Sequence, residues 1–303
     1  MEAWLRTQAG FERARVEAVE PFAGGASNIT CRLALRDAPV AAAVLRLQRT
    51  RGIFEPYDVL REGEVLRRLA ATDVPVPRVL AAEHDLSVLG APFLLLEFVD
   101  APHMGEAGPE ADFGAFTAAV AGVHALDWRA AGLDMLGVPA SPAAGFAAEV
   151  ETVAKRMPAF GCEREPLLAR ALDALRACTP GGGRLALCQG DINVFNYLFR
   201  ARKVVAVVDW EQARISDPRS DVGHLLALSH LKGAPFGPAE EMPFAVMYGQ
   251  ASGRPLEAMA PFRAFWLFQL GVIYHGWRAF NGSDPWYTWP QLEELLGAAL
   301  AEL

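Results

Sequence analysis

The feature that most constrains the fold is a change in the hydrophobic pattern about a third of the way along the chain. Up to residue 98, apolar residues fall in short segments separated by turn residues, which is typical of β-strands. Beyond residue 102 they recur at helical spacing, and only residues 185–209 interrupt that pattern. The sequence therefore predicts an α+β fold with two lobes, a small one formed by residues 1–98 and a larger, mostly helical one formed by residues 99–303.

The first lobe is predicted to hold a five-stranded antiparallel sheet and one helix. That helix should cover residues 58–71, where an apolar stripe runs from Val59 to Ala70. Glu62 lies on the same stripe, and a carboxylate that faces a core is costly unless a cation meets it. Glu62 is therefore predicted to have a buried cationic partner. The strands are expected at residues 16–21, 28–35, 40–47, 79–83 and 93–98.

The second lobe is predicted from its helical periodicity. Turn residues and Pro or Gly positions separate the apolar segments from one another. The expected helices cover residues 112–127, 143–157, 164–178, 218–230, 238–251, 256–280 and 289–302.

Charge and composition argue against several classes of protein. The net charge of -8 is opposite to what a general nucleic-acid binder needs. We find neither a signal peptide nor an apolar segment of membrane-spanning length, so we expect no membrane partner and a cytoplasmic location. The 4 cysteines lack zinc-site spacing and suggest no disulfide framework. A globular enzyme with 52% hydrophobic residues fits these observations.

The β-rich interruption between residues 185 and 209 carries the polar residues that indicate chemistry. A hairpin whose first strand begins at Asn196 and whose second ends at Asp209 would bring these side chains to the same end. Oxygen ligands of this kind suit Mg²⁺. Asp191, five residues before Asn196, could then orient an attacking hydroxyl or accept its proton.

These motifs resemble the aminoglycoside phosphotransferase and choline kinase-like family, and in particular the kinase-like domains associated with acyl-CoA dehydrogenases. Its catalytic loop usually reads His-Gly-Asp, four residues and Asn, and its metal-binding aspartate usually leads into Asp-Trp-Glu or a similar triplet. Gln189-Gly190-Asp191 with Asn196, and Asp209-Trp210-Glu211, match this pattern except at Gln189. The resemblance implies a protein-kinase-like two-lobed fold.

The resemblance also implies a nucleotide site in the first lobe. The turn Phe22–Asn28 is similar to the family's phosphate-covering turn, which assigns Gly24, Gly25, Ser27 and Asn28 to nucleotide binding. Arg46 stands where many kinases carry a phosphate-binding lysine, and it supplies the partner expected for Glu62. The segment Leu95–Val99 resembles the inter-lobe hinge, so the backbone of Glu97 and Val99 should contact the adenine. Asp217 should cap a helix that begins at Pro218, and Asp221 should support the catalytic loop.

The function implied is phosphoryl transfer from ATP, with GTP as a second option, to a hydroxyl group of a small molecule in the presence of Mg²⁺. Asp191, Asn196 and Asp209 are the expected catalytic residues, and the last two are the expected metal ligands. Oligomeric state is left open.

The acceptor is less constrained by the sequence. The cluster Tyr274, His275, Trp277, Trp286 and Trp289 is a candidate wall for an uncharged apolar or aromatic acceptor. An aminoglycoside or a choline-like amino alcohol is the alternative acceptor. A nucleotide-binding regulatory protein with weakened catalysis, marked by Gln189, is the alternative function.

Overall fold

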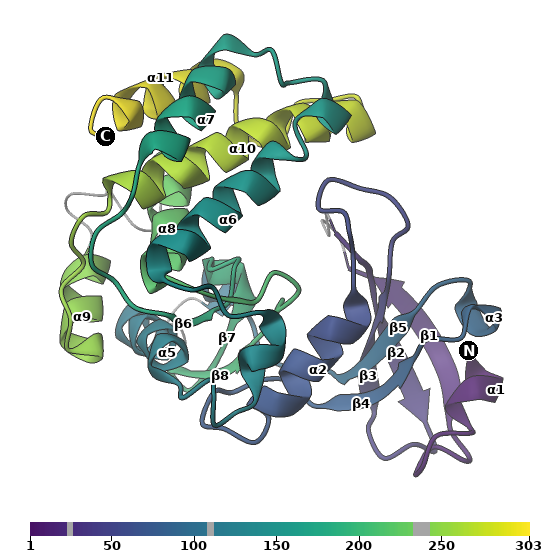
Figure 1. Ribbon diagram of the computed structural model, residues 1–303. Helices are drawn as coiled ribbons and strands as arrows, with labels where there is room; N and C mark the ends of the chain where they lie inside the picture. The colour runs from purple at the N-terminus through teal and green to yellow at the C-terminus, as the bar shows by residue number, and fades with distance from the viewer. Residues whose placement is uncertain (23–26, 108–111, 233–242) are drawn as a thin grey trace.

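The computed structural model describes residues 1–22, 27–107, 112–232 and 243–303. It has two lobes, a small N-terminal one built on a sheet and a larger helical one (Figure 1). The sheet has five strands in the order β1-β2-β3-β5-β4, and every neighbouring pair is antiparallel. Both the α+β class and the kinase-like architecture expected from the sequence are confirmed.

The strand predictions of the first lobe are confirmed to within two residues at each end. Alternation places one face of β2 and β3 in a buried cluster with Trp4, Phe11 and Phe93, because successive side chains of a strand point to opposite faces. The strands are β1 (Arg15–Pro21), β2 (Ile29–Arg36), β3 (Ala42–Leu47), β4 (Val79–Glu83) and β5 (Phe93–Glu97).

Helix α2 (Val59–Leu69) crosses the sheet and carries Glu62 inward. Asp58 caps it, because its carboxylate accepts the N–H of Arg61 at 2.9 Å. The expected stripe is buried as far as Leu69, but Ala70 is exposed. The helix ends at Leu69, so Ala70 is already its C-cap residue and turns away from the core.

The second lobe contains the predicted helices with small shifts at their ends. The described part of the helix expected at residues 238–251 begins at Pro243, since residues 233–242 lie outside the described ranges. Its longer helices are α5 (Phe113–Ala125), α6 (Pro142–Ala154), α7 (Pro166–Ala177), α8 (Pro218–Lys232), α9 (Pro243–Ser252), α10 (Ala260–Asn281) and α11 (Trp289–Leu300).

Several short elements were not predicted. Helices α1 (Glu2–Leu5), α3 (Leu86–Leu89) and α4 (Met104–Ala107) have four residues each. Strands β6 (Ala186–Cys188) and β9 (Arg214–Ser216) form a two-stranded sheet beside the hairpin β7 (Tyr197–Arg200) and β8 (Lys203–Val207).

One hydrophobic core joins the two lobes. Val59, Leu66 and Leu69 of α2 belong to the same buried cluster as Phe116 of α5 and Trp210, which follows β8. Figure 1 shows α2 beside the small sheets of the second lobe. The residues that α2 carries and those around Trp210 are therefore held at a fixed separation.

Among the described residues, no helix combines the length and the apolar character needed to cross a bilayer.

Candidate active site

The β7–β8 hairpin brings Asn196 and Asp209 to one end, as the spacing predicted. Tyr197 pairs with Val207, and the N–H of Val208 donates to the carbonyl of Asn196 at 2.9 Å. Regular pairing ends at Val207, and Asp209 adopts φ 64°, in the left-handed region that non-glycine residues rarely occupy. Strain of this kind persists only where the surroundings hold it, and it gathers at functional sites.

Asp191 lies against the same end of the hairpin. Its carboxylate accepts hydrogen bonds from the side-chain amides of Asn193 and Asn196, each at 3.1 Å. Burial, and then the charge of Asp209 nearby, raise the pKa of Asp191 to about 6. The carboxylate form therefore still predominates at neutral pH, and it is a stronger base than an exposed aspartate.

Glycine is required immediately before Asp191. Gly190 adopts φ 91°, and a Cβ built there would lie 2.3 Å from the carbonyl oxygen of Gln212. The catalytic loop therefore packs directly on the backbone that follows the Asp209-Trp210-Glu211 triplet.

Asp221 stabilises this loop through hydrogen bonds to its backbone, as the sequence suggested. Its carboxylate accepts the N–H groups of Gln189 and Gly190 at 2.7 and 3.1 Å, and it lies 3.2 Å from Nε2 of His124. Burial opposes the charge, but the contact with His124 and the positive charge of Arg214 hold the pKa of Asp221 below its usual value. Asp217 likewise caps α8, since it accepts the N–H of Arg219 at 3.0 Å.

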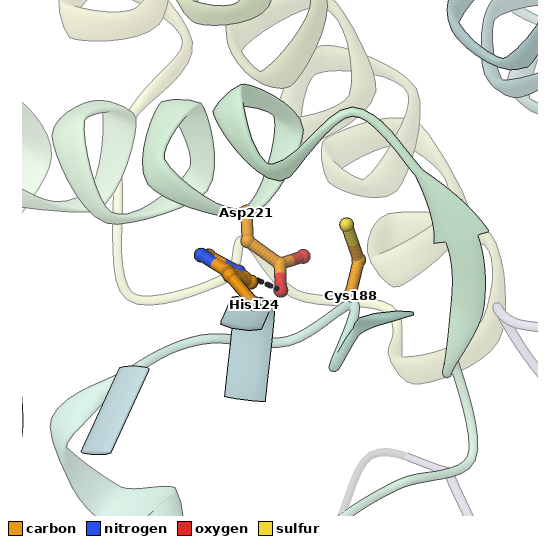
Figure 2. A group of neighbouring side chains, drawn as sticks. All are labelled: His124, Cys188 and Asp221. Carbon is orange, nitrogen blue, oxygen red and sulfur yellow. Dashed lines mark hydrogen bonds and ion pairs between the residues drawn. The ribbon is translucent and has the colours of Figure 1, made fainter. Parts of the chain in front are cut away.

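Figure 2 shows His124, Cys188 and Asp221 as neighbours. Their possible ligand atoms all lie within 4.8 Å of one another. Both carboxylate oxygens of Asp221 already accept hydrogen bonds, and Nδ1 of His124 lies 2.8 Å from the hydroxyl of Tyr248. Burial raises the pKa of the Cys188 thiol well above its usual range. We assign this group to support of the catalytic loop, because metal binding would break those hydrogen bonds.

Gln189, the departure from the family pattern, is fully buried. Its side-chain amide donates to the carbonyl of Val208 at 2.7 Å, and its oxygen accepts the hydroxyl of Tyr197 at 3.1 Å. Glutamine therefore links the catalytic loop to both strands of the hairpin, a role that the sequence could not assign.

Arg46 of β3 is the cation that Glu62 was predicted to need. Their atoms lie 3.0 Å apart, and both side chains are almost fully buried. The same guanidinium also binds Asp209 and Glu211, each at 3.0 Å. The arginine thus joins the sheet, α2 and the triplet at the lobe junction.

Three carboxylates share this one guanidinium. Burial raises the pKa of both Glu62 and Glu211, and the charge of Asp209 raises them further. One oxygen of Glu62 has no hydrogen-bond partner among the described residues. The cluster therefore has an excess of negative charge, which additional positive charge would stabilise.

Glu211 is a site residue that the sequence reasoning had named only as part of a motif. It accepts the amide N–H of Asn28 at 2.8 Å and also a hydrogen bond from Ser27. The predicted phosphate-covering turn is thereby tied to the triplet. Gly24 and Gly25 lie outside the described residues.

The expected hinge residues lie at the end of β5, the last strand of the sheet in chain order. Glu97 ends β5 opposite Ala43, and its side chain binds Arg78 at 3.0 Å. The carbonyl of Val99 accepts the N–H of Ala101 at 2.9 Å. Their contact with a nucleotide stays a prediction.

A cavity of about 570 Å³ is lined by Glu211 and the residues that follow it, and the predicted aromatic wall does not line it. Tyr274, His275 and Trp289 pack against one another where α10 meets α11. The aromatic residues that α10 contributes to the cavity are instead Phe265 and Trp266. Helix α10 carries aromatics on every side, so the sequence could not identify those facing the cavity.

The catalytic loop, the left-handed aspartate and the Arg46–Glu62 pair on a two-lobed fold define the class of kinase-like phosphotransferases. The chain belongs to the phosphotransferase enzyme family, whose sequence pattern matches residues 18–265.

Curated proteins similar to this chain are acyl-CoA dehydrogenase family members. Acyl-CoA dehydrogenase family member 10 from Mus musculus is 30% identical over 215 residues, which are 67% of this chain and 20% of that protein. The chain spans at most about a third of the length of the first curated relatives it matches.

Solved structures show the same fold. One is a suggested aminoglycoside phosphotransferase from Ralstonia eutropha, with a TM-score of 0.70 and 24% identity, covering 99% of this chain and 94% of that one. Another is a thermostable mutant of an aminoglycoside phosphotransferase in complex with AMP-PNP and hygromycin B, with a TM-score of 0.65, 14% identity and 99% and 98% coverage. At these identities the likeness shows the fold alone.

Proposed function

We propose that this protein transfers the γ-phosphoryl group of ATP, or of GTP, to a hydroxyl group of a small molecule in a Mg²⁺-dependent reaction. The observation that carries this proposal is the meeting of Asp191, Asn196 and Asp209 at one end of the hairpin, across from Arg46. The acceptor is a small hydroxylated compound, with no nucleic-acid or membrane partner. The functional division near residue 98 and the cytoplasmic location belong to the same proposal.

The nucleotide is assigned to the junction of the lobes. Arg46, held by Glu62, is the cation that would bind its phosphates, with Ser27 and Asn28 in the covering turn. The likeness to a structure in complex with AMP-PNP supports a nucleotide here.

The donor atoms fit Mg²⁺. Asn196 donates its N–H to Asp191, which leaves its oxygen as an acceptor, and Asp209 uses one oxygen for Arg46. Within the described ranges, the other oxygen of Asp209 and the amide oxygen of Asn196 form no hydrogen bond. Oxygen ligands at a crowded group of carboxylates favour a hard divalent cation. When bound, Mg²⁺ would neutralise charge that develops on the phosphates.

Asp191 is the residue assigned to the hydroxyl group of the acceptor. It orients the hydroxyl and takes its proton as the oxygen forms a bond to the γ-phosphorus. The bond from that phosphorus to the bridging oxygen breaks, and ADP leaves with the electron pair. Asn193 and Asn196 hold the carboxylate during this step through their amide groups.

Calorimetric titration of ATP with and without Mg²⁺ tests the metal assignment. Mg²⁺ should strengthen ATP binding to the wild type, and Asp209→Asn should lose that effect because it removes a ligand charge. Asp173→Asn is a control, since it changes an exposed carboxylate on α7. Mg²⁺-dependent turnover that survives in Asp209→Asn would refute the assignment.

The role of Asp191 separates the enzyme from a regulatory nucleotide-binding protein. Asp191→Ala should lower kcat by about a hundredfold or more, with little change in ATP affinity. ADP release with a panel of alcohols measures this. Nucleotide binding with no transfer to any alcohol in the wild type would favour the regulatory alternative.

A further inference from the structure

The cavity beside Glu211 has both acidic and basic side chains in its wall. It lies between the segment that leads into α2, helices α6 and α10, and the residues after Trp210. Its volume of about 570 Å³ falls within the usual range for sites that hold metabolite-sized molecules. Phe265 and Trp266 provide an apolar wall.

The carboxylates that line the cavity, Asp58, Glu149 and Glu211, already have partners. Glu149 binds Arg214 at 2.8 Å, and Glu211 binds Arg46 at 3.0 Å. Asp58 accepts the backbone N–H of Arg61 in the first turn of α2. An amine-bearing acceptor would therefore have to compete for acids that are already engaged.

Two arginines that line the cavity, Arg156 and Arg61, form no ion pair with a carboxylate of the described residues. Arg156 follows α6, and its guanidinium lies 6.0 Å from the centre of the Phe54 ring. Arg61 donates to the backbone carbonyls of Glu211 and Ala213 at 3.1 and 2.5 Å.

The surroundings of both arginines disfavour an isolated positive charge. Burial lowers the pKa of Arg156 and of Arg61, and Asp58 offsets this only in part for Arg61. A guanidinium that has lost water without gaining a carboxylate is stabilised when an anion binds it, and its planar donors suit carboxylate and phosphate groups.

We infer that this cavity takes a hydroxylated acceptor that carries a carboxylate or phosphate group, with the anion bound by Arg156 and with Arg61 adding positive charge to the same wall. The apolar part of the acceptor packs on Phe265 and Trp266. This inference rests on the proposed function and names its substrate class. It replaces the uncharged acceptor that the sequence alone suggested.

His224 connects the cavity wall to the catalytic loop. Trp266 stacks on the ring of His224 with 4.0 Å between centroids, and Nδ1 of His224 lies 3.6 Å from the carboxylate of Asp191. Only the side chain of His224 therefore separates Trp266 in the cavity wall from Asp191, the proposed base. The inference requires a molecule anchored by its anion at Arg156 to extend along this wall toward Asp191.

The test uses matched pairs of alcohols that differ in charge. Aliphatic and aromatic hydroxy acids are compared with their methyl esters, and hydroxylated phosphate monoesters with their dephosphorylated parents. Binding is measured by calorimetry with Mg²⁺ and AMP-PNP present, so that the nucleotide site stays filled, and transfer by ADP release from ATP. The variants are Arg156→Gln and Arg156→Lys.

The anionic member of a pair should bind and react better in the wild type. Arg156→Gln should weaken its binding by about tenfold or more, the value of a hydrogen bond to a charged group, and should leave the neutral member unchanged. Arg156→Lys should keep part of the preference because it keeps the charge. Arg176→Gln is the control, since it removes an exposed arginine on α7 that pairs with Glu151.

Other results are equally decisive. Equal binding of anionic and neutral members, no binding of either, or a preference that survives in Arg156→Gln would overturn the inference. Transfer to neutral alcohols in that case would leave the phosphotransferase function standing. Anion binding that Arg156→Gln abolishes, without transfer to any alcohol, would support the anion site and count against the proposed function.

Discussion

At the residue scale, the buried carboxylate of Asp221 is the support on which the catalytic loop depends. It accepts two backbone N–H groups of that loop and a contact from His124. Asp221→Asn places an N–H group against at least one of these donors, so we expect a loss of roughly 3–5 kcal/mol in the free energy of unfolding. Urea denaturation measures it, and Asp173→Asn, at an exposed position of α7, is the control.

The same carboxylate predicts a pH dependence. Its pKa is lower in the folded protein than the ordinary value of 3.8. A depressed carboxyl pKa gives stability that is present above the unfolded pKa and is lost as pH falls through the folded one. The difference in unfolding free energy between the wild type and Asp221→Asn should therefore be constant near neutral pH and shrink below about pH 4. A difference that does not change with pH would show that the charge is unimportant.

Gln189 leads to a second prediction at this scale. Gln189→Leu keeps the volume but leaves the carbonyl of Val208 and the hydroxyl of Tyr197 buried without their partner. We expect a loss of about 1–3 kcal/mol for each unsatisfied group, measured by chemical denaturation. Gln250→Leu, at an exposed position of α9, should change little. Equal effects of the two changes would mean that Gln189 does not fasten the loop.

Individual site residues were predictable where a motif fixed their spacing. Asp191, Asn196 and Asp209 could be named from the sequence because a hairpin converts their separation into proximity. Phe265, Trp266 and Arg156 could not, because they come from α10 and from the turn after α6, and the relative rotation of these helices depends on packing throughout the second lobe.

At the element scale, glycines in two helices should respond oppositely to the same change. A Cβ at Gly63 of α2 would lie 2.6 Å from the fully buried side chain of Leu94, whereas nothing lies within 4 Å of one at Gly122 of α5. Gly122→Ala should stabilise the protein by about 0.5–1 kcal/mol through helix propensity. Gly63→Ala should destabilise it by about 1–3 kcal/mol through overpacking, and both shifts are measured by thermal unfolding.

Gly63→Ala also reports on the site. Displacing α2 from β5 moves the neighbouring Glu62 away from Arg46, so ATP affinity should fall in Gly63→Ala and stay constant in Gly122→Ala. Stabilisation by both changes would mean that α2 has room to shift without cost.

Elements were predictable in proportion to their length. The strands of the first sheet and the long helices repeat their pattern often enough to be recognised. Strands β6 and β9 have three residues each and pair across 30 positions of chain, as in Ala186 with Ser216, so no periodicity marks them. Tertiary contacts stabilise such short pairs, and the sequence pattern carries no sign of them.

At the scale of the whole molecule, the two lobes are bound too closely to behave as separate units. The core cluster runs from Leu66 of α2 to Trp210 in the second lobe. Arg46 bonds both to α2 and to the triplet, and Arg61 donates to the backbone carbonyls of Glu211 and Ala213. The boundary that the sequence pattern suggested near residue 98 marks a change of secondary structure, and the core crosses it.

This continuity predicts a single unfolding transition. Arg46→Met removes the only cation that contacts Glu62 among the described residues and leaves that carboxylate buried, which should cost roughly 3–5 kcal/mol. Because the lobes share a core, differential scanning calorimetry should show the whole transition moving to lower temperature, with calorimetric and van't Hoff enthalpies equal. Arg36→Met removes an exposed ion pair with Glu17 and should lower the free energy of unfolding by about 0.5 kcal/mol or less. A variant in which only a first, smaller transition moves would show that the N-terminal lobe unfolds alone, and Arg46 would then stabilise that lobe without coupling it to the catalytic loop.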